Sequence, residues 1–253
     1  MSRVLDVAWV PAELPAPLAA GGPAVVIDVV RATTSITTAL AAGARRVIAV
    51  ATVAEARARA AALEGALLCG EREGLPPVGF DLGNSPGSYT AERVSGRTLV
   101  FTTTNGTRAM TAAAGADPLM LACFRNLETV AGRLARDLDR SPKGDGAVLV
   151  CAGRRGRVSM DDAWCAGHLV DRVARIRPDL SLTDGACAAR ELAGALGAPT
   201  ARALARTSAG RAGVALELGG DLEDCARLDD LDVVPLWRAG AFVTGGEEES
   251  DGG

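Results

Sequence analysis

This chain of 253 residues has little of several features that mark common classes of protein. It contains no run of about 20 apolar residues, and Pro11, Pro15 and Pro17 interrupt the stretch near the N-terminus, so we expect neither a membrane-spanning helix nor a secretory leader. The formal net charge of −4 gives no chain-wide attraction to nucleic acid or to an anionic membrane surface. We therefore expect no nucleic-acid partner and no membrane partner.

The chain also lacks closely spaced cysteine pairs and has almost no lysine. The 6 cysteines are scattered, form no C-x-x-C pair and mostly lie in apolar segments, as buried free thiols do. This pattern favours a reducing, cytoplasmic location. Lys143 is the only lysine, so nearly every cation is an arginine, and a single arginine is weaker evidence of function than usual.

Two familiar catalytic motifs are missing. The chain has no G-x-x-x-x-G-K-[ST] run, which excludes a P-loop, and no G-x-S-x-G elbow, which disfavours a Ser/His/Asp hydrolase. His168 is the only histidine and lies in a helical segment without a partner nearby in sequence. We interpret it as a packed or surface residue.

What the chain does have is a regular alternation of apolar, β-branched segments with helical segments, up to Cys151. This alternation predicts an α/β fold, with three layers (α/β/α) around a mostly parallel or mixed sheet. The expected strands are Val4–Val10, Val25–Val30, Val47–Ala51, Ala66–Cys69, Thr98–Thr103, Leu119–Cys123 and Ala147–Cys151. The expected helices are Ser35–Ala42, Ala54–Leu63, Thr107–Ala114 and Leu127–Leu138.

The pattern changes after Cys151, where the sequence becomes largely helical and only Asp232–Trp237 is typical of a further strand. A helical subdomain over about residues 160–230 is one interpretation. Proline and glycine punctuate turns without forming a long linker, so we predict a single domain over residues 1–244. Residues 245–253 are acidic and glycine-rich, which predicts a disordered tail.

Polar side chains follow four of the expected strands. Because the carboxyl ends of parallel strands meet at one edge of a sheet, where ligands bind in α/β folds, we expect these four groups to share one rim. The groups are Asp28 with Arg31, Glu71 with Glu73, Thr102–Arg108, and Gly153–Arg157.

The segment TTTNGTR, Thr102–Arg108, places hydroxyls, an amide and a glycine at a strand-to-helix turn. Free backbone N–H groups and the positive end of a helix dipole favour an anion there, so the turn suits a phosphate or a carboxylate. The alternative is a plain helix cap by Thr104 or Asn105, with Gly106 forming the turn. Both interpretations use the same groups.

Asp28 ends a strand so apolar that an unpaired carboxylate there would be costly. It should therefore meet a cation, either Arg31 in a structural pair or a metal ion. Phosphatases with an aspartyl nucleophile carry a second Asp two residues later, whereas this chain has Val30, which weakens a covalent aspartyl-phosphate route.

Carboxylates gather in two further segments. The loop of residues 70–86 is long for a compact domain and contains Glu71, Asp81, Asn84 and Ser85, an oxygen supply that suits Mg²⁺, although turn formation alone would explain some of them. Asp161 and Asp162 begin a helix after Ser159, where capping accounts for one acid and leaves the other free to order a water or a metal.

Taken together, these segments resemble the 2-phosphosulfolactate phosphatase family, and the resemblance covers nearly the whole chain. It rests on VIDVVRATTS (26–35), GERE (70–73), GFDLGNSP (79–86), TTTNGTRA (102–109), CAGRRGRVSMDDAWCAG (151–167) and LDVVP (231–235). Two departures are Asp161-Asp162, where relatives have Glu-Asp, and Ala209, where relatives often show His. The second puts in doubt a role of that position in substrate choice.

The resemblance implies an α/β phosphoric monoester hydrolase that needs Mg²⁺ and converts (R)-2-phospho-3-sulfolactate to (R)-3-sulfolactate and phosphate, as in coenzyme M biosynthesis. The alternatives are a phosphatase for another small phosphorylated hydroxy acid and a non-catalytic protein that binds small anions. The expected partner is a small anionic phosphorylated substrate, and a homodimer is an assembly that the sequence leaves open.

Within this resemblance we assign hypothetical roles. Asp28 and Glu71 hold Mg²⁺, Asp162 or Asp81 orients the attacking water, and Arg108 with Arg154 holds the carboxylate and sulfonate. Asp28, Asp81 and Asp162 are the candidate catalytic residues. The candidate substrate-binding residues are Arg31, Thr33, Thr34, Asn84, Ser85, Thr103, Thr104, Asn105, Gly106, Thr107, Arg108 and Arg154.

Overall fold

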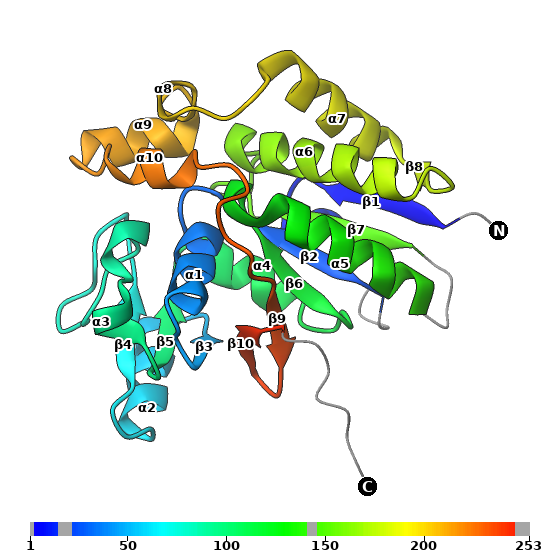
Figure 1. Ribbon diagram of the computed structural model, residues 1–253. Coiled ribbons are helices and arrows are strands. Elements are labelled where there is room, and N and C mark those ends of the chain that lie inside the picture. The colour runs from blue at the N-terminus through cyan, green and yellow to red at the C-terminus, as the bar shows by residue number, and fades with distance from the viewer. Residues whose placement is uncertain (1–2, 15–21, 141–145, 246–253) are drawn as a thin grey trace, which may run out of the picture.

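The computed structural model describes residues 3–14, 22–140 and 146–245, and it contains a mixed sheet with helices on both faces (Figure 1). The predicted α/β fold class is confirmed. The sheet has the strand order β4-β5-β3-β10-β9-β6-β2-β7-β1-β8. The strands are β1 (Val4–Ala8), β2 (Ala24–Ile27), β3 (Arg46–Ala49), β4 (Leu67–Gly70), β5 (Thr98–Thr102), β6 (Leu119–Ala122), β7 (Ala147–Cys151), β8 (Ser181–Leu182), β9 (Pro235–Arg238) and β10 (Ala241–Thr244).

Two parallel groups of strands make up the sheet, and an antiparallel hairpin joins them. β4, β5 and β3 are parallel to one another, as are β6, β2, β7, β1 and β8. The β9–β10 hairpin lies between the groups and pairs Phe242 with Val47 on one side and Leu236 with Met120 on the other. Figure 1 shows the two groups on opposite sides of this hairpin.

The described helices have the following bounds. They are α1 (Ala32–Ala41), α2 (Val53–Ala61), α3 (Ala91–Val94), α4 (Gly106–Ala112), α5 (Leu127–Arg140), α6 (Met160–Ile176), α7 (Asp184–Leu196), α8 (Ala201–Leu204), α9 (Ser208–Ala215) and α10 (Asp221–Cys225). Short 3-10 helices cover Pro11–Glu13, Pro86–Ser88 and Phe124–Asn126. None of the described helices is long and apolar enough to cross a membrane.

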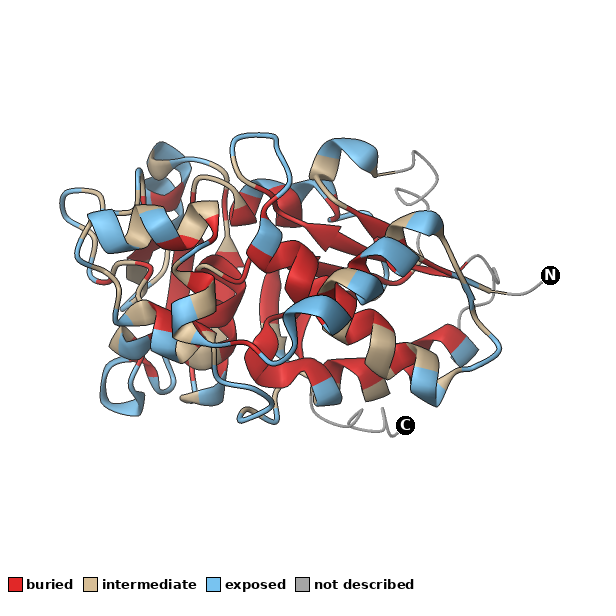
Figure 2. Ribbon diagram, turned by 90° about the horizontal axis from the view of Figure 1, so that it is seen from above, coloured by how far each residue is buried: buried red, intermediate tan, exposed pale blue. Residues whose placement is uncertain are grey.

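Alternate residues of β2 face the two layers of helices that cover the sheet. Val25 and Ile27 belong to the core beneath α5, α6 and α7, whereas Ala24 and Val26 belong to the core that includes residues of α1 and α4. Every residue of β2 is apolar and buried, as expected of a parallel strand covered on both faces. Figure 2 shows that the strands in the middle of the molecule are buried.

Helix α1 is the central element between the two parallel groups. It contacts β3 and β6, one strand from each group, as well as both strands of the hairpin. Its buried hydroxyls bond back to the chain, with Thr33 donating to Asp28 O at 2.9 Å and Thr34 to Val29 O at 2.7 Å. These bonds fix the turn after β2 and start the helix at Ala32, three residues earlier than the sequence predicts.

The C-terminal third is largely helical, as predicted, but two strands there were missed. β8 pairs only two residues with β1, and β10 follows the tight turn at Ala239 and Gly240. The strand predicted at Asp232–Trp237 begins instead at Pro235. Of the tail predicted to be disordered, residues 246–253 lie outside the described part of the chain.

Candidate active site

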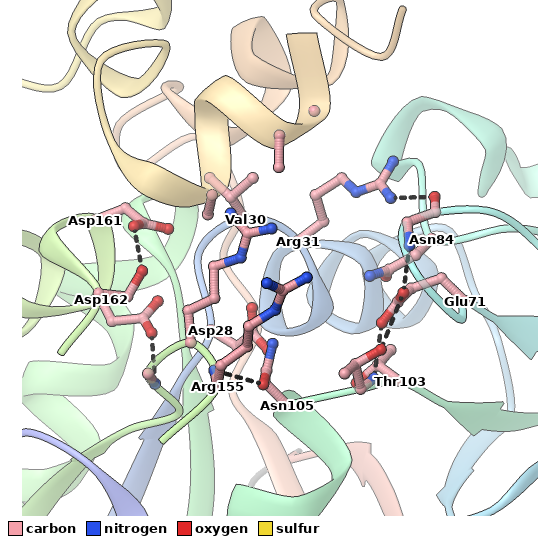
Figure 3. A pocket seen from close by; sticks show the side chains of 18 of the residues that line it. Asp28, Val30, Arg31, Glu71, Asn84, Thr103, Asn105, Arg155, Asp161 and Asp162 are labelled. Carbon is pink, nitrogen blue, oxygen red and sulfur yellow. Dashed lines mark hydrogen bonds between the residues drawn. The ribbon is translucent and has the colours of Figure 1, made fainter. Parts of the chain in front are cut away.

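A cavity of about 460 Å³ lies where helices α1, α4, α6 and α9 begin (Figure 3). Residues from all four predicted rim groups line it, so the structure brings those groups together. Helix N-termini carry free N–H groups and a partial positive charge, which favours an anion. The lining residues are Asp28, Val30, Arg31, Glu71, Glu73, Gly74, Asn84, Thr103, Thr104, Asn105, Gly153, Arg154, Arg155, Ser159, Asp161, Asp162, Ala209, Ala212, Gly213 and Leu216.

Asp28 sits just past β2 and is only 8% exposed. Burial, followed by the negative charges of Asp161 and Glu71, raises the pKa of its carboxyl to about 7, while a backbone bond from Ala32 and the charge of Arg31 act in the opposite direction. Among the described residues Asp28 forms no salt bridge. This carboxyl group therefore lacks the cation that its position calls for.

Gly106 lets the start of α4 approach Asp28. A Cβ atom there would lie 2.5 Å from Ala32 Cβ and 2.6 Å from Asp28 Oδ2, which no side chain can accommodate without movement. The first turns of α1 and α4 thus meet at the carboxyl group of Asp28.

Arg31 does not form the structural pair with Asp28 that the sequence allowed. Its guanidinium instead contacts Asp221 Oδ2 at 2.5 Å and donates to Gly74 O at 2.7 Å, with Ser85 Oγ at 3.4 Å. Ser85 donates to the same Asp221 oxygen at 2.9 Å. Arg31 therefore ties α10 to the loop after β4, and it forms no salt bridge with Asp28 in the described part of the chain.

Glu71 braces the TTTNGTR turn. Its Oε1 accepts from Thr104 N at 2.7 Å, and its Oε2 accepts from Gly74 N at 2.7 Å and from Thr104 Oγ1 at 3.2 Å. Asn105 occupies the N-cap position of the following helix, one of the two caps that the sequence allowed, but its side chain makes no capping bond, and Thr103 Oγ1 instead accepts from Thr107 N at 3.1 Å. Glu71 thereby joins the loop after β4 to the loop after β5.

Asp162 joins two other loops in the same way. Its Oδ1 accepts from Val29 N at 2.9 Å and its Oδ2 from Gly153 N at 3.0 Å, so one carboxylate holds the ends of both β2 and β7. Asp161 accepts from Ser159 Oγ at 2.6 Å, a contact that replaces the expected capping by Ser159. Burial raises the pKa of both carboxyls, and that of Asp162 also rises because Asp161 and Asp28 are close.

The arginine-rich turn after β7 forms the mouth of the cavity. Arg154 and Arg157 exchange backbone bonds of 2.8 and 3.0 Å, Arg154 donates from its guanidinium to Ser208 O at the start of α9, and Arg155 N donates to Asn105 Oδ1 at 3.3 Å. Gly153 has a φ of 64° and lies so close to Arg157 O that a Cβ would be 2.6 Å away.

Some of the sequence-predicted residues lie outside the cavity. Asp81 is exposed and accepts from Leu68 N at 2.7 Å, and Arg108 is exposed on the outer side of α4. Three predicted threonines are buried behind the cavity, where their hydroxyls bond to the backbone: Thr33, Thr34 and Thr107. Gly106 packs against Asp28, and Ser85 donates a hydrogen bond to Asp221.

One side of the cavity was not predicted from the sequence. Ala209, Ala212 and Gly213 of α9 and the adjacent Leu216 line it opposite the sheet, and small apolar residues carry no chemical signature that would reveal this. Glu73 and Arg155, with φ angles of 55° and 52°, also line the cavity; both belong to the predicted rim groups, but neither was assigned a role. Only the departure at Ala209 had drawn attention to this region.

Buried carboxylates and converging helix N-termini at the carboxyl ends of strands are typical of α/β enzymes. Residues 9–240 match the profile of the 2-phosphosulpholactate phosphatase family, and the chain belongs to this family of phosphoric monoester hydrolases.

Three relatives show how far the likeness extends, and each carries the name probable 2-phosphosulfolactate phosphatase. The relative from Symbiobacterium thermophilum is 40% identical over 232 residues, which is 90% of this chain and 97% of the relative. The relative from Thermotoga petrophila is 39% identical over 220 residues, covering 87% and 91%. The one from Pseudothermotoga lettingae is 43% identical over 179 residues, covering 71% and 72%.

Proposed function

We propose that this protein is a Mg²⁺-dependent phosphatase that hydrolyses (R)-2-phospho-3-sulfolactate to (R)-3-sulfolactate and phosphate, a reaction of the coenzyme M biosynthesis type, in the cytoplasm. The names of the relatives support the substrate. The unpaired cysteines, five of them buried, suit a reducing compartment. The observation that carries the proposal is Asp28, a buried carboxyl without a cation at the meeting point of two helix N-termini.

The residues present fit a hard divalent cation. Within the described chain no three Asp, Glu, His or Cys side chains cluster tightly enough to hold a metal by themselves. Mg²⁺ needs only one or two protein carboxylates, because water and phosphate oxygens complete its shell. Asp28 would supply one and Glu71, whose oxygens already brace the turn, a second, while the buried Oδ1 of Asn84 has no hydrogen-bond partner and remains an available acceptor.

Bound there, Mg²⁺ would neutralise charge that develops on the phosphoryl group. The N-termini of α1 and α4 and the turn from Thr103 to Asn105 would bind the phosphoryl oxygens. Asp162, held by two backbone N–H groups, would orient the attacking water. Asp81 lies outside the cavity, so Asp162 is the better supported of the two acids predicted for this role.

Phosphate release from synthetic 2-phospho-3-sulfolactate, measured in EDTA and after Mg²⁺ is restored, tests this function. We expect the wild-type protein to be active only with Mg²⁺ and Asp28→Asn to lose about 10³-fold or more in kcat, since it removes the ionised group. Asp81→Asn is the matched control, because Asp81 is an exposed carboxylate outside the cavity.

Full activity of Asp28→Asn would contradict the metal role. Release from other small phosphorylated hydroxy acids but not from this substrate would move the assignment to those acids. Binding without release on every substrate would instead indicate an anion-binding protein.

A further inference from the structure

Three arginines line the cavity, and only one of them has a guanidinium without a partner in the described chain. Arg31 is held by Asp221 and Gly74, and Arg154 by the carbonyl oxygen of Ser208. The side chain of Arg155 forms neither a hydrogen bond nor a salt bridge with the described residues, and Figure 3 shows it pointing into the cavity between the acidic side and the Glu71 side. Arg155 is thus the cation in the cavity that remains available to a ligand.

The backbone at Arg155 is held in place more tightly than an ordinary surface turn. Its φ of 52° is unfavourable for a residue with a side chain, and such strain persists only where surrounding contacts impose it. Here four bonds do so: the backbone pair between Arg154 and Arg157, the bond from Gly153 N to Asp162 Oδ2, and the bond from Arg155 N to Asn105 Oδ1. These contacts fix the backbone so that the side chain of Arg155 points into the cavity.

The position of Arg155 also complements the rest of the cavity. The phosphoryl group is expected at the starts of α1 and α4, deep in the cavity beside Asp28, whereas Arg155 is exposed at the mouth. A guanidinium presents two parallel N–H groups, which match the two oxygens of a carboxylate or a sulfonate. Both places belong to one cavity of about 460 Å³.

We infer that Arg155 binds the second oxyanion of the substrate, the carboxylate or sulfonate that is not hydrolysed, and so makes the enzyme selective for phosphate esters that carry another negative charge. This assignment rests on the proposed function. It differs from the sequence-based assignment to Arg108, which lies outside the cavity.

Three probe substrates that differ in one group test this role. They are 2-phosphoglycolate, which has a carboxylate, 2-sulfoethyl phosphate, which has a sulfonate, and ethyl phosphate, which has neither. For Arg155→Ala we expect kcat/KM to fall about 10- to 100-fold on a probe whose second anion Arg155 binds, the range for a lost charged hydrogen bond, and less than about 3-fold on ethyl phosphate. A fall on only one of the two anionic probes would identify which anion is bound.

Arg157→Ala is the matched control, because Arg157 belongs to the same turn and is exposed but does not line the cavity. We expect it to behave as the wild type on all three probes. Equal losses of Arg155→Ala on all three, or no loss on either anionic probe, would overturn the role of Arg155.

A binding measurement separates this inference from the proposed function. Calorimetric titration with 3-sulfolactate, which carries both anions and no phosphate, should show affinity at least about 10-fold weaker for Arg155→Ala than for Arg157→Ala. If the wild type releases no phosphate from any substrate and this difference persists, the proposed phosphatase fails while the anion site stands. Equal affinities of the two variants would refute the anion site, whatever the turnover.

Discussion

The cavity has two walls that are built differently. The polar wall comprises the loops that follow β2, β4, β5 and β7, and its carboxylates join those loops through backbone N–H groups: Glu71 joins two of them and Asp162 the other two. The helical wall is made by Ala209, Ala212, Gly213 and Leu216, which offer no charged side chain. In the proposed function, the polar wall would carry the chemistry and the helical wall would limit the size of the ligand.

The walls also differ in how they are fixed. The polar wall is anchored in the sheet, whereas α9 and α10 lie to one side of it (Figure 1) and reach the polar wall through a few contacts. These include Arg154 with Ser208 O, Arg31 with Asp221, and the close approach of Leu216 to Gly74. Substitutions in the polar wall should therefore affect catalysis sharply, and substitutions at these contacts should affect substrate affinity and stability.

Among substitutions that compare the two walls, the largest effect is expected from adding a single methyl group to the polar wall. Gly106→Ala places a Cβ 2.6 Å from Asp28 Oδ2 and 2.5 Å from Ala32 Cβ, so the two helix starts must separate. We expect a loss of about 1–3 kcal/mol in unfolding free energy and about 10²-fold in kcat, because small displacements of a reacting group are costly. Thermal unfolding and phosphate release measure the two effects.

The same substitution in the helical wall is the control. A Cβ at Gly213 meets no atom within 4 Å, so Gly213→Ala should keep kcat within about 3-fold and raise stability by up to about 1 kcal/mol through helix propensity. Equal behaviour of the two variants would show that the walls do not differ in tolerance.

A smaller effect is expected where the walls are joined. Asp221→Ala leaves the Arg31 guanidinium, whose side chain is 7% exposed, without its carboxylate. We expect stability to fall by about 1–3 kcal/mol and KM to rise about 3- to 10-fold, with kcat changed less, since the polar wall keeps its own bonds. Steady-state kinetics and denaturant titration test this.

Asp224→Ala on the same helix is the comparison for this contact. Among the described residues the side chain of Asp224 forms one salt bridge, with the exposed Arg227 at 3.5 Å, and such a pair contributes at most about 1 kcal/mol. An unchanged KM in Asp221→Ala would mean that the contact does not position the helical wall.

The two walls explain how much of the site could be predicted from sequence. Asp28, Glu71, the turn at Thr104 and Asp162 all line the cavity. The rule that the carboxyl ends of parallel strands meet at one edge explains this within each parallel group, because the rule needs only the order of strands and helices along the chain. It does not explain why the two groups meet, because three antiparallel pairings separate β3 from β6 and the groups therefore run in opposite directions. The helical wall depends on packing between distant segments of small apolar residues, and no local pattern specifies that packing.

Pairings over long distances escaped prediction for the same reason. Arg31 and Asp221 are 190 positions apart, and nothing near either residue indicates the other. The sheet shows a similar limit: its parallel groups follow from the alternation of elements, but the β9–β10 hairpin that joins them forms only two pairings with its neighbours, Phe242 with Val47 and Leu236 with Met120.

The last effect concerns the titration of the Asp28 carboxyl group in the polar wall. The folded-state pKa of Asp28 is raised from 3.8 to about 7, so between these values the folded protein holds a proton that the unfolded chain has lost. The stability contributed by this group is complete below about pH 4, declines as pH rises, and is gone above about pH 7. Asp28→Asn removes this dependence because an amide does not ionise.

In EDTA we therefore expect Asp28→Asn to melt at least about 2 °C above the wild type at pH 8, with the difference shrinking toward zero as pH falls to 4. Asp221→Asn in the contact between the walls is the comparison, and its melting temperature should fall below that of the wild type at pH 8, because it weakens the pair with Arg31. A wild type that is as stable as Asp28→Asn at pH 8 would mean that the polar wall already neutralises Asp28 without a metal, and the contrast in charge between the two walls would then disappear.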